Sequence, residues 1–211
     1  MKFERKLVYG IGVNDSTERT EYMKDGKRIK CPIYVMWVNM FKRCYSEAYL
    51  ETHKSYVGCY VSDKWIYFTK FKGWVLTQDW KGKNLDKDLL FKDNKEYGPD
   101  TCVFVPPYIN TAVGMRKLYD NGYPEGVSPQ SASGKLVGSI SVEGRRVALG
   151  YFTCPKTAHK AWQIAKSAQI ETVALSYSGE TGFDQRVFDA LMQKVLALRE
   201  DLLENRETVS L

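Results

Sequence analysis

The sequence predicts an α+β fold in which short antiparallel strands and amphipathic helices follow one another along the chain. Residues 134–152 contain two runs of alternating apolar residues, and the pair Glu143-Gly144 between them is typical of a tight hairpin turn. A helical pattern follows from Pro155, with Thr153 as a candidate N-cap. Aromatic residues recur at helical spacing in two segments of the first half. We therefore expect helices in the first half and a small sheet covered by one helix in the second.

The elements of the first half follow from local patterns. Residues 1–30 are expected to form a β-hairpin, because Asp25-Gly26 offers a tight turn after a run rich in strand-forming residues. A helix that begins at Pro32 would bury one face, made of Val35, Met36, Trp37, Met40, Phe41 and Cys44. A second helix, capped near Ser62-Asp63, would bury Trp65, Phe68, Phe71, Trp74 and Val75. Residues 45–58 between them are expected to form a long polar and aromatic loop.

The later elements are read in the same way. Residues 85–110 have the layout strand, loop, strand and helix start. Residues 183–206 form a C-terminal amphipathic helix whose apolar stripe contains Val187, Leu191, Val195, Leu198 and Leu202. The stripe either packs on the body of the protein or pairs with a second copy. Because it is short for an independent coiled coil, packing on the body is favoured.

Size and composition indicate a folded, water-soluble protein. The chain has 211 residues, of which 44% are hydrophobic and 13% aromatic, enough for one or two modest domains. It has no apolar run long enough to span a bilayer, and its first residues lack the apolar core of a secretion signal. We expect a cytoplasmic protein without a membrane partner.

The five cysteines are odd in number and include no Cys-x-x-Cys pair, so a disulfide framework or a zinc ribbon is disfavoured. Reduced, mostly buried thiols are the simpler interpretation. A zinc site made of Cys31, Cys44, His53 and Cys59 is the alternative, because cysteine and histidine are the usual zinc ligands.

The positive charge is concentrated in the first two thirds of the chain. The net charge is +6; residues 116–166 hold eight Lys/Arg against three Asp/Glu, whereas residues 171–211 hold four against eight. Basic surface attracts phosphate through counterion release, an effect that weakens with salt. The charge fits a nucleic-acid partner, and a basic protein without such a partner is the alternative.

Residues 123–168 resemble the plant ethylene-response-factor (Apetala-type) DNA-binding domain, which also occurs in phage endonucleases. The resemblance lies in Gly126-Val127, Gly134-Lys135, Arg145-Arg146-Val147, Leu149-Gly150-Tyr151-Phe152 and the helix from Pro155. It implies a three-stranded antiparallel sheet packed on one helix, with the exposed face of the sheet in the major groove of double-stranded DNA. The DNA-binding positions it implies are Ser128, Gln130, Lys135, Ser139, Ser141, Arg145 and Arg146.

Residues 85–110 resemble the HNH, or histidine-metal-finger, nuclease core of free-standing phage homing endonucleases. The resemblance implies a divalent metal, Mg²⁺ or Mn²⁺, held by Asp86 and Asn110. Lys87 stands at the position of the catalytic histidine, and Thr101 at that of the asparagine that orients it. A charged lysine cannot accept a proton, so Asp88 or His53 would have to supply the base. Alternatively, the two aspartates flank a turn and the asparagine caps a helix.

Taken together, the two resemblances imply a phage homing-endonuclease architecture. Its parts would be a hairpin (1–30), a degenerate HNH-like region with two aromatic core helices (31–115), an Apetala-type domain (120–170) and the C-terminal helix (183–206). The function implied is metal-dependent cleavage of double-stranded DNA in the host-cell cytoplasm. The alternative is a catalytically inactive DNA-binding or regulatory protein that inhibits a host factor. The C-terminal helix could contact a host protein or a second copy of the chain.

Overall fold

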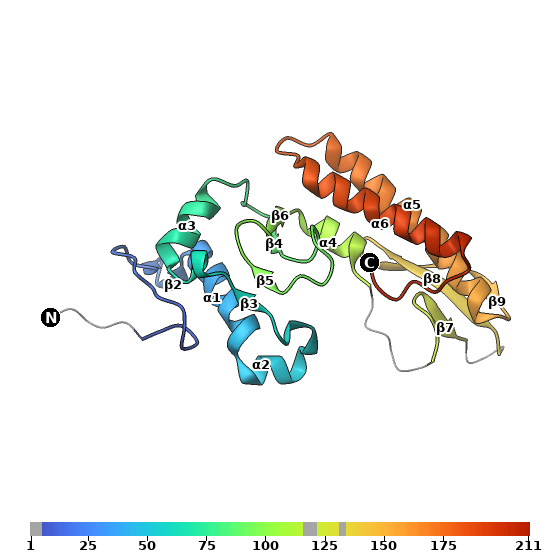
Figure 1. The fold of residues 1–211 in the computed structure, drawn as a ribbon, viewed down its shortest axis with the longest axis horizontal. Helices are drawn as coiled ribbons and strands as arrows, with labels where there is room; N and C mark the ends of the chain where they lie inside the picture. Colours follow the sequence, from blue (N-terminus) through green and yellow to red (C-terminus); the bar gives the residue numbers. More distant parts are fainter. Residues whose placement is uncertain (1–5, 116–121, 131–133) are drawn as a thin grey trace. The chain divides into compact units, whose positions relative to one another are not determined.

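The computed structural model describes residues 6–115, 122–130 and 134–211, which form two compact units (Figure 1). The N-terminal unit covers residues 1–104 and the C-terminal unit residues 105–211. The fold is α+β, with small sheets in both units, as the sequence predicts. No helix in the described ranges is both long enough and apolar enough to cross a membrane.

The hairpin expected over residues 1–30 forms over residues 21–30 only. Strands β1 (Glu21–Lys24) and β2 (Lys27–Lys30) pair antiparallel around Asp25 and Gly26, whose φ angles are 50° and 72°. Two consecutive residues with positive φ are characteristic of the type I′ turn that joins two-residue hairpins. The elements that follow are α1 (Pro32–Tyr45), α2 (Glu47–Thr52), η1 (Lys54–Tyr56), β3 (Tyr60–Val61), η2 (Asp63–Trp65), α3 (Phe68–Leu76), β4 (Asn84–Asp86), β5 (Glu96–Tyr97) and β6 (Val103–Val105).

An aromatic core joins α1 to η2 and α3. Trp37, fully buried, donates a hydrogen bond from Nε1 to the carbonyl oxygen of Trp65 at 2.8 Å. Its ring contacts those of Phe41 and Phe68, with centroid separations of 4.8 and 5.6 Å. The predicted buried face of α1 is confirmed at Trp37, Met40, Phe41 and Cys44, whereas Val35 is exposed.

Two predictions for this unit are wrong. The helix expected from Ser62 is interrupted, because Val13 pairs with the backbone of Ile66 and Phe68 and draws that segment out of helical geometry. Only a 3₁₀ turn (η2) forms before α3. The loop expected over residues 45–58 contains α2 and η1, in which the rings of Tyr49 and Tyr56 pack against Lys42 and Arg43 of α1.

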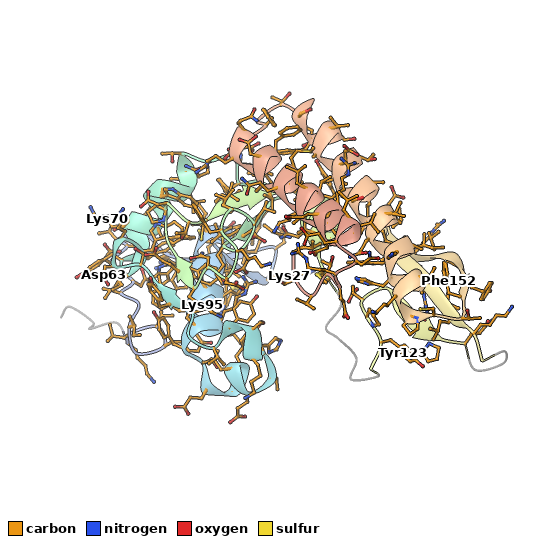
Figure 2. All side chains as sticks on the ribbon, turned by 45° about the vertical axis from the view of Figure 1, so that its right-hand side comes forward. Lys27, Asp63, Lys70, Lys95, Tyr123 and Phe152 are labelled. Atoms are coloured by element: carbon orange, nitrogen blue, oxygen red, sulfur yellow. The ribbon has the colours of Figure 1, made fainter. Side chains whose placement is uncertain are left out.

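The C-terminal unit contains the expected three-stranded antiparallel sheet packed on a helix. Its strands are β7 (Val127–Pro129), β8 (Leu136–Val142) and β9 (Arg145–Phe152), in the order β7-β8-β9. The sheet packs on α5 (Pro155–Ser178), and its small core consists of Val127, Leu136 and Ala158, flanked by Tyr123 and Phe152 (Figure 2). The N-cap of α5 is Cys154 rather than Thr153. The unit also contains α4 (Pro107–Val113) and α6 (Gln185–Leu203).

A bulge determines which residues of β9 face outward. Ala148 pairs with Ser139 and Gly150 with Gly138, so Leu149 is an extra residue on β9. Because side chains alternate along a strand, the bulge places Val147 and Tyr151 on opposite faces. The apolar alternation predicted for β9 is therefore wrong: Tyr151 is 59% exposed and Val147 44% exposed.

The predicted stripe of the C-terminal helix packs on the protein's own body. Val187, Leu191, Val195 and Leu198 of α6 are fully buried, and α6 runs alongside α5 (Figure 1). Burial of four large apolar side chains contributes roughly 6–12 kcal/mol in transfer free energy. The stripe is consequently not available for pairing with a second copy of the chain.

Candidate nucleic-acid interface and the expected metal site

The face of the sheet turned away from α5, which we call the outer face, carries three serines and one arginine beside apolar and aromatic side chains. Register and alternation assign to it Ser128 of β7, Val137, Ser139 and Ser141 of β8, and Arg146, Ala148 and Tyr151 of β9. The three strands contain two arginines and no aspartate or glutamate; the nearest acid in sequence is Glu143, in the hairpin turn. Of these charges, the outer face carries only the positive charge of Arg146.

Arg146 is held across the outer face by two serines. Its Nε donates to Ser139 Oγ at 2.9 Å, and its Nη2 donates to Ser128 Oγ. These bonds cross all three strands, and Ser139 is buried beneath the guanidinium, at 4% exposed. Three of the residues expected to contact DNA therefore form one contiguous group with a fixed guanidinium.

The other expected DNA-binding residues lie around this group. Ser141 is directly opposite Arg146 in the register. The backbone N–H of Gln130 donates to the carbonyl oxygen of Lys135 at 2.9 Å, where β7 ends and β8 begins. Arg145 is exposed, but alternation places it on the face opposite to that of Arg146. The outer face thus presents one of the two adjacent arginines.

In the N-terminal unit, Asp86 organises a turn. Its Oδ1 accepts hydrogen bonds from the backbone N–H groups of Asp88 and Leu89, at 2.8 and 2.7 Å. This is the Asx-type role that the sequence left open as an alternative to metal binding. Asp88 is largely exposed and pairs with Lys87.

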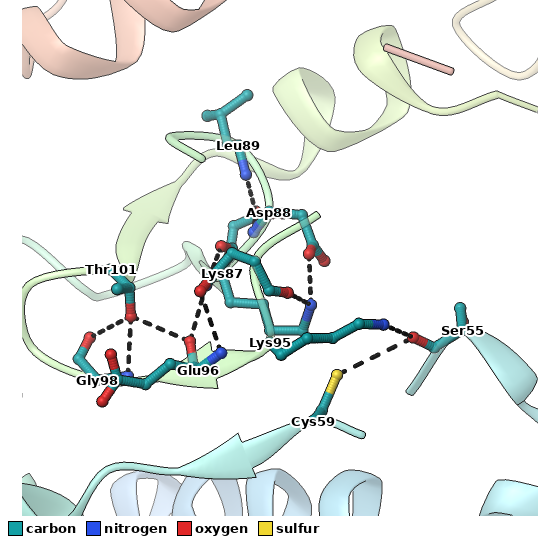
Figure 3. Close-up of polar contacts among 11 residues, drawn as sticks. Ser55, Cys59, Lys87, Asp88, Leu89, Lys95, Glu96, Gly98 and Thr101 are labelled. Carbon is teal, nitrogen blue, oxygen red and sulfur yellow. Dashed lines mark hydrogen bonds and ion pairs between the residues drawn. The ribbon is translucent and has the colours of Figure 1, made fainter. Parts of the chain in front are cut away.

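Lys87, at the position of the expected catalytic histidine, is a buried cation. Its side chain is 5% exposed, and Nζ donates to Asp88 Oδ1 and to the carbonyl oxygen of Asn94 at 2.7 Å (Figure 3). Burial lowers the pKa of Lys87, but the hydrogen bond and charge of Asp88 outweigh that effect, so the pKa lies above its ordinary value. Lys87 therefore remains protonated at neutral pH and cannot serve as a general base.

Sequence reasoning missed the role of Asn94 in this turn. The side-chain amide of Asn94 donates to the carbonyl oxygens of Lys87 and Glu96, and its oxygen accepts from the Glu96 N–H. Thr101 Oγ1 donates to the carbonyl oxygen of Glu96 at 3.0 Å and accepts from the N–H of Gly98 (Figure 3). Asn94 thus ties the β4–β5 loop to backbone groups, and Thr101 ties the β5–β6 loop to β5.

The other candidate base, His53, and the other candidate metal ligand, Asn110, belong to different units of the protein. His53 stacks on Tyr49 at 3.8 Å between ring centroids, and its Nδ1 lies 2.8 Å from Thr52 Oγ1. Asn110 belongs to α4 of the C-terminal unit, and its Oδ1 is buried without a hydrogen-bond partner in the described structure. Asp86 belongs to the N-terminal unit.

The described residues include no group of three or more His, Cys, Asp or Glu side chains that could hold a metal. This observation contradicts the zinc site considered for Cys31, Cys44, His53 and Cys59. Mg²⁺ is bound by several oxygen ligands. In the described ranges the buried amide oxygen of Asn110 has no hydrogen-bond partner, whereas Asp86 Oδ1 already accepts two N–H groups. Asp86 and Asn110 belong to different units, so the Mg²⁺ or Mn²⁺ site expected from them stays a prediction.

One cysteine should react much faster than the others. Cys154 is exposed at the N-cap of α5, and hydrogen bonds from Thr157 and Lys156 lower the pKa of its thiol. Burial raises the pKa of Cys44 and Cys102 to about 12. Titration of the native protein with a disulfide reagent near neutral pH should therefore show one fast thiol, and Cys154→Ser should remove that phase. A fast phase that persists in the variant would contradict the assignment.

No protein-family model, curated protein or solved structure matches this chain.

Proposed function

We propose that the protein binds double-stranded DNA through the outer face of the β7-β8-β9 sheet. The observation that supports this most is the fixed guanidinium of Arg146, which crosses the sheet on hydroxyls of Ser128 and Ser139. A guanidinium held in one orientation loses little side-chain entropy when it binds a phosphate or a base edge. A two- or three-stranded antiparallel sheet can enter the major groove.

The surroundings of Arg146 support the same proposal. The three strands of the sheet carry no carboxylate, so nothing on them would repel a phosphate backbone. The hydroxyl of Ser141 and the exposed ring of Tyr151 extend the outer face on either side. Hydroxyls donate to phosphate oxygens, and aromatic rings contact sugars and base edges. The outer face thus combines hydroxyls that can contact the DNA backbone with an arginine and a tyrosine that can reach into a groove.

A gel-shift experiment over a series of salt concentrations tests this function. Each lost phosphate contact reduces the slope of log K against log salt by about 0.9. We expect Arg146→Ala to reduce the slope by about that amount and to weaken binding about tenfold. Arg145→Ala, on the opposite face, should change the slope less. Arg199→Ala, an exposed residue of α6 paired with Glu171, is the control that should change nothing.

If Arg145→Ala and Arg146→Ala lowered the affinity and the salt slope equally, the outer face would not be the DNA-binding surface. DNA binding by another surface of the protein would still be compatible with that result. An unchanged slope in Arg146→Ala would reject the interface. The stability of each variant is checked by thermal unfolding, so that a loss of binding is not confused with a loss of fold.

We further propose that the expected nuclease reaction is absent and that the protein binds DNA without cutting it. Lys87, the residue at the position of the base, is a buried cation paired with Asp88. The Asp86 carboxylate supports the adjoining turn through two N–H groups. The support for this proposal is thus the chemistry of the residues present, and it favours the regulatory alternative over cleavage.

A plasmid nicking assay with Mg²⁺ or Mn²⁺ tests the lack of cleavage. We expect nicking at background level in the parent protein, in Asp86→Ala and in Asn110→Ala. Asp86→Ala should instead lower stability by about 1–2 kcal/mol, because two backbone donors lose their acceptor. Metal-dependent nicking by the parent that both substitutions remove would overturn this proposal and show that the protein is an endonuclease.

A further inference from the structure

The N-terminal unit contains a half-buried guanidinium that has no carboxylate partner among the described residues. Arg43 lies in the last turn of α1, 5.8 Å from the centroid of the Tyr56 ring. It donates a hydrogen bond to the hydroxyl of Tyr97, which is buried. Ion pairs in the described part of this unit involve other cations: Arg28, Lys30, Lys64, Lys72, Lys83 and Lys87.

The charge on Arg43 is permanent and incompletely compensated. Burial lowers its pKa, but Tyr97 and Tyr56 outweigh burial, so the pKa lies above its ordinary value. The guanidinium therefore stays charged at every physiological pH. Neutral hydroxyls and an aromatic face compensate a buried cation less well than an anion does. The site would thus be stabilised by an anion from outside the chain.

Two lysines contact residues that neighbour Arg43, since the rings of Tyr49 and Tyr56 lie 5.8 Å apart. Lys42 lies over the ring of Tyr49, with Nζ 5.3 Å from the centroid. Lys95 donates from Nζ to the carbonyl oxygen of Ser55 at 3.3 Å, immediately before Tyr56 in the chain (Figure 3). Both lysines retain donors for a ligand, because an ammonium group has three.

The acids in this region offset little of that charge. Asp88 is paired with Lys87, so these two charges cancel each other. Glu47 and Glu51 of α2 are exposed, and solvent and salt screen them. Positive charge on Arg43, Lys42 and Lys95 therefore remains.

We propose that Arg43 binds a phosphate group, with Lys42 and Lys95 as flanking contacts and the rings of Tyr49 and Tyr56 as the walls of the site. A guanidinium fork matches two oxygens of a phosphate, and aromatic walls suit the sugar or base attached to it. The phosphate comes either from a nucleic-acid backbone or from a free phosphate compound. The site lies in the N-terminal unit and does not depend on DNA binding by the outer face.

Thermal unfolding of the full chain tests the site with pyrophosphate as the probe, against sodium chloride at equal ionic strength. At about ten times its Kd, pyrophosphate should raise the Tm of the N-terminal unit by about 5 °C. Arg43→Gln should abolish the increase, and Lys42→Gln combined with Lys95→Gln should reduce it. Arg28→Gln, an exposed arginine of β2 in the same unit, is the matched control and should leave the increase intact.

A second measurement needs no variant. The Nε–Hε resonance of Arg43 should shift on titration with pyrophosphate, which keeps the proposal testable if Arg43→Gln does not fold. To separate the two sources of phosphate, an oligothymidylate is compared with its uncharged methylphosphonate form. Binding of the charged strand alone, lost in Arg43→Gln, assigns a nucleic-acid backbone, whereas a response to pyrophosphate alone assigns a free phosphate compound. If neither probe moves the resonance, or if the Tm increase survives in Arg43→Gln, the proposal is wrong.

Discussion

Replacement of Gly126 by alanine should destabilise the C-terminal unit by about 2–5 kcal/mol. Gly126 has a φ of +77°, a conformation that costs an L-residue about 1–2 kcal/mol. A Cβ at this position would lie 2.2 Å from Cδ1 and Cγ of Trp162, which is 2% exposed and cannot move without disturbing the core under the sheet. Overpacking of this kind costs a further 1–3 kcal/mol, roughly. The glycine lets the chain pass over the indole ring as it enters β7.

Gly144 provides a matched control for this prediction. Its φ is +76°, but no heavy atom lies within 4 Å of the position that a Cβ would take. Gly144→Ala should therefore show only the backbone cost, about 1–2 kcal/mol. Both variants are compared with the parent by urea unfolding, followed by hydrogen exchange of the α5 amides so that the C-terminal unit is observed separately. If both variants lost the same unfolding free energy, the clash of a Cβ with Trp162 would not contribute to the effect of Gly126→Ala.

The local elements could be predicted because each has a short-range cause. The pairs Asp25-Gly26 and Glu143-Gly144 produce hairpins because both residues of each adopt positive φ. The apolar stripe of α6 has helical periodicity, and it is buried on the neighbouring helix. In these places the local pattern and the tertiary packing agree.

Elements that depend on distant residues could not be predicted. Helix formation between Ser62 and Phe68 is prevented by backbone pairing with Val13, more than fifty residues before Ile66 and Phe68. The bulge at Leu149 reverses the face of Tyr151, and only the register with β8 reveals it. The periodicity of the sequence reveals neither the interrupted helix nor the bulge, because both result from hydrogen bonds to another part of the chain.

The candidate site shows the same division. Resemblance to a DNA-binding domain pointed to Ser128, Ser139 and Arg146, and the structure joins them by hydrogen bonds. The exposed setting of Arg145 on the other face needed the register. The sequence did not single out Arg43, because the helical pattern places it on the solvent-facing side of its helix. Its burial depends on Tyr56 and Tyr97, which come from later elements.

Lys166 should make the stability of the C-terminal unit increase with pH in alkaline solution. Its side chain lies on the inner side of α5, 4% exposed, and Nζ donates to the carbonyl oxygen of Gly114 at 2.9 Å. Burial lowers the pKa of Lys166 to about 8, against a partial opposing effect of Glu125. An unfolded lysine has a pKa of about 10.4, so between about pH 8 and 10.4 the unfolded chain binds more protons than the folded one. Unfolding free energy therefore rises with pH across this window, by roughly 3 kcal/mol from this group.

Substitution of Lys166 by methionine should remove this pH dependence and stabilise the unit at neutral pH. Methionine fills a similar volume without a charge, so up to about 3 kcal/mol should be gained below pH 8, less about 1 kcal/mol for the lost bond to Gly114. Other lysines and tyrosines also titrate in this range, and the difference between parent and variant cancels their contribution. Lys156→Met, at an exposed position of α5, should leave the slope unchanged. A group whose pKa is the same in the folded and unfolded states adds no pH dependence to the unfolding free energy. If the parent and Lys166→Met show parallel curves of unfolding free energy from pH 7 to about 10, burial of the Lys166 ammonium therefore does not destabilise the folded unit as proposed.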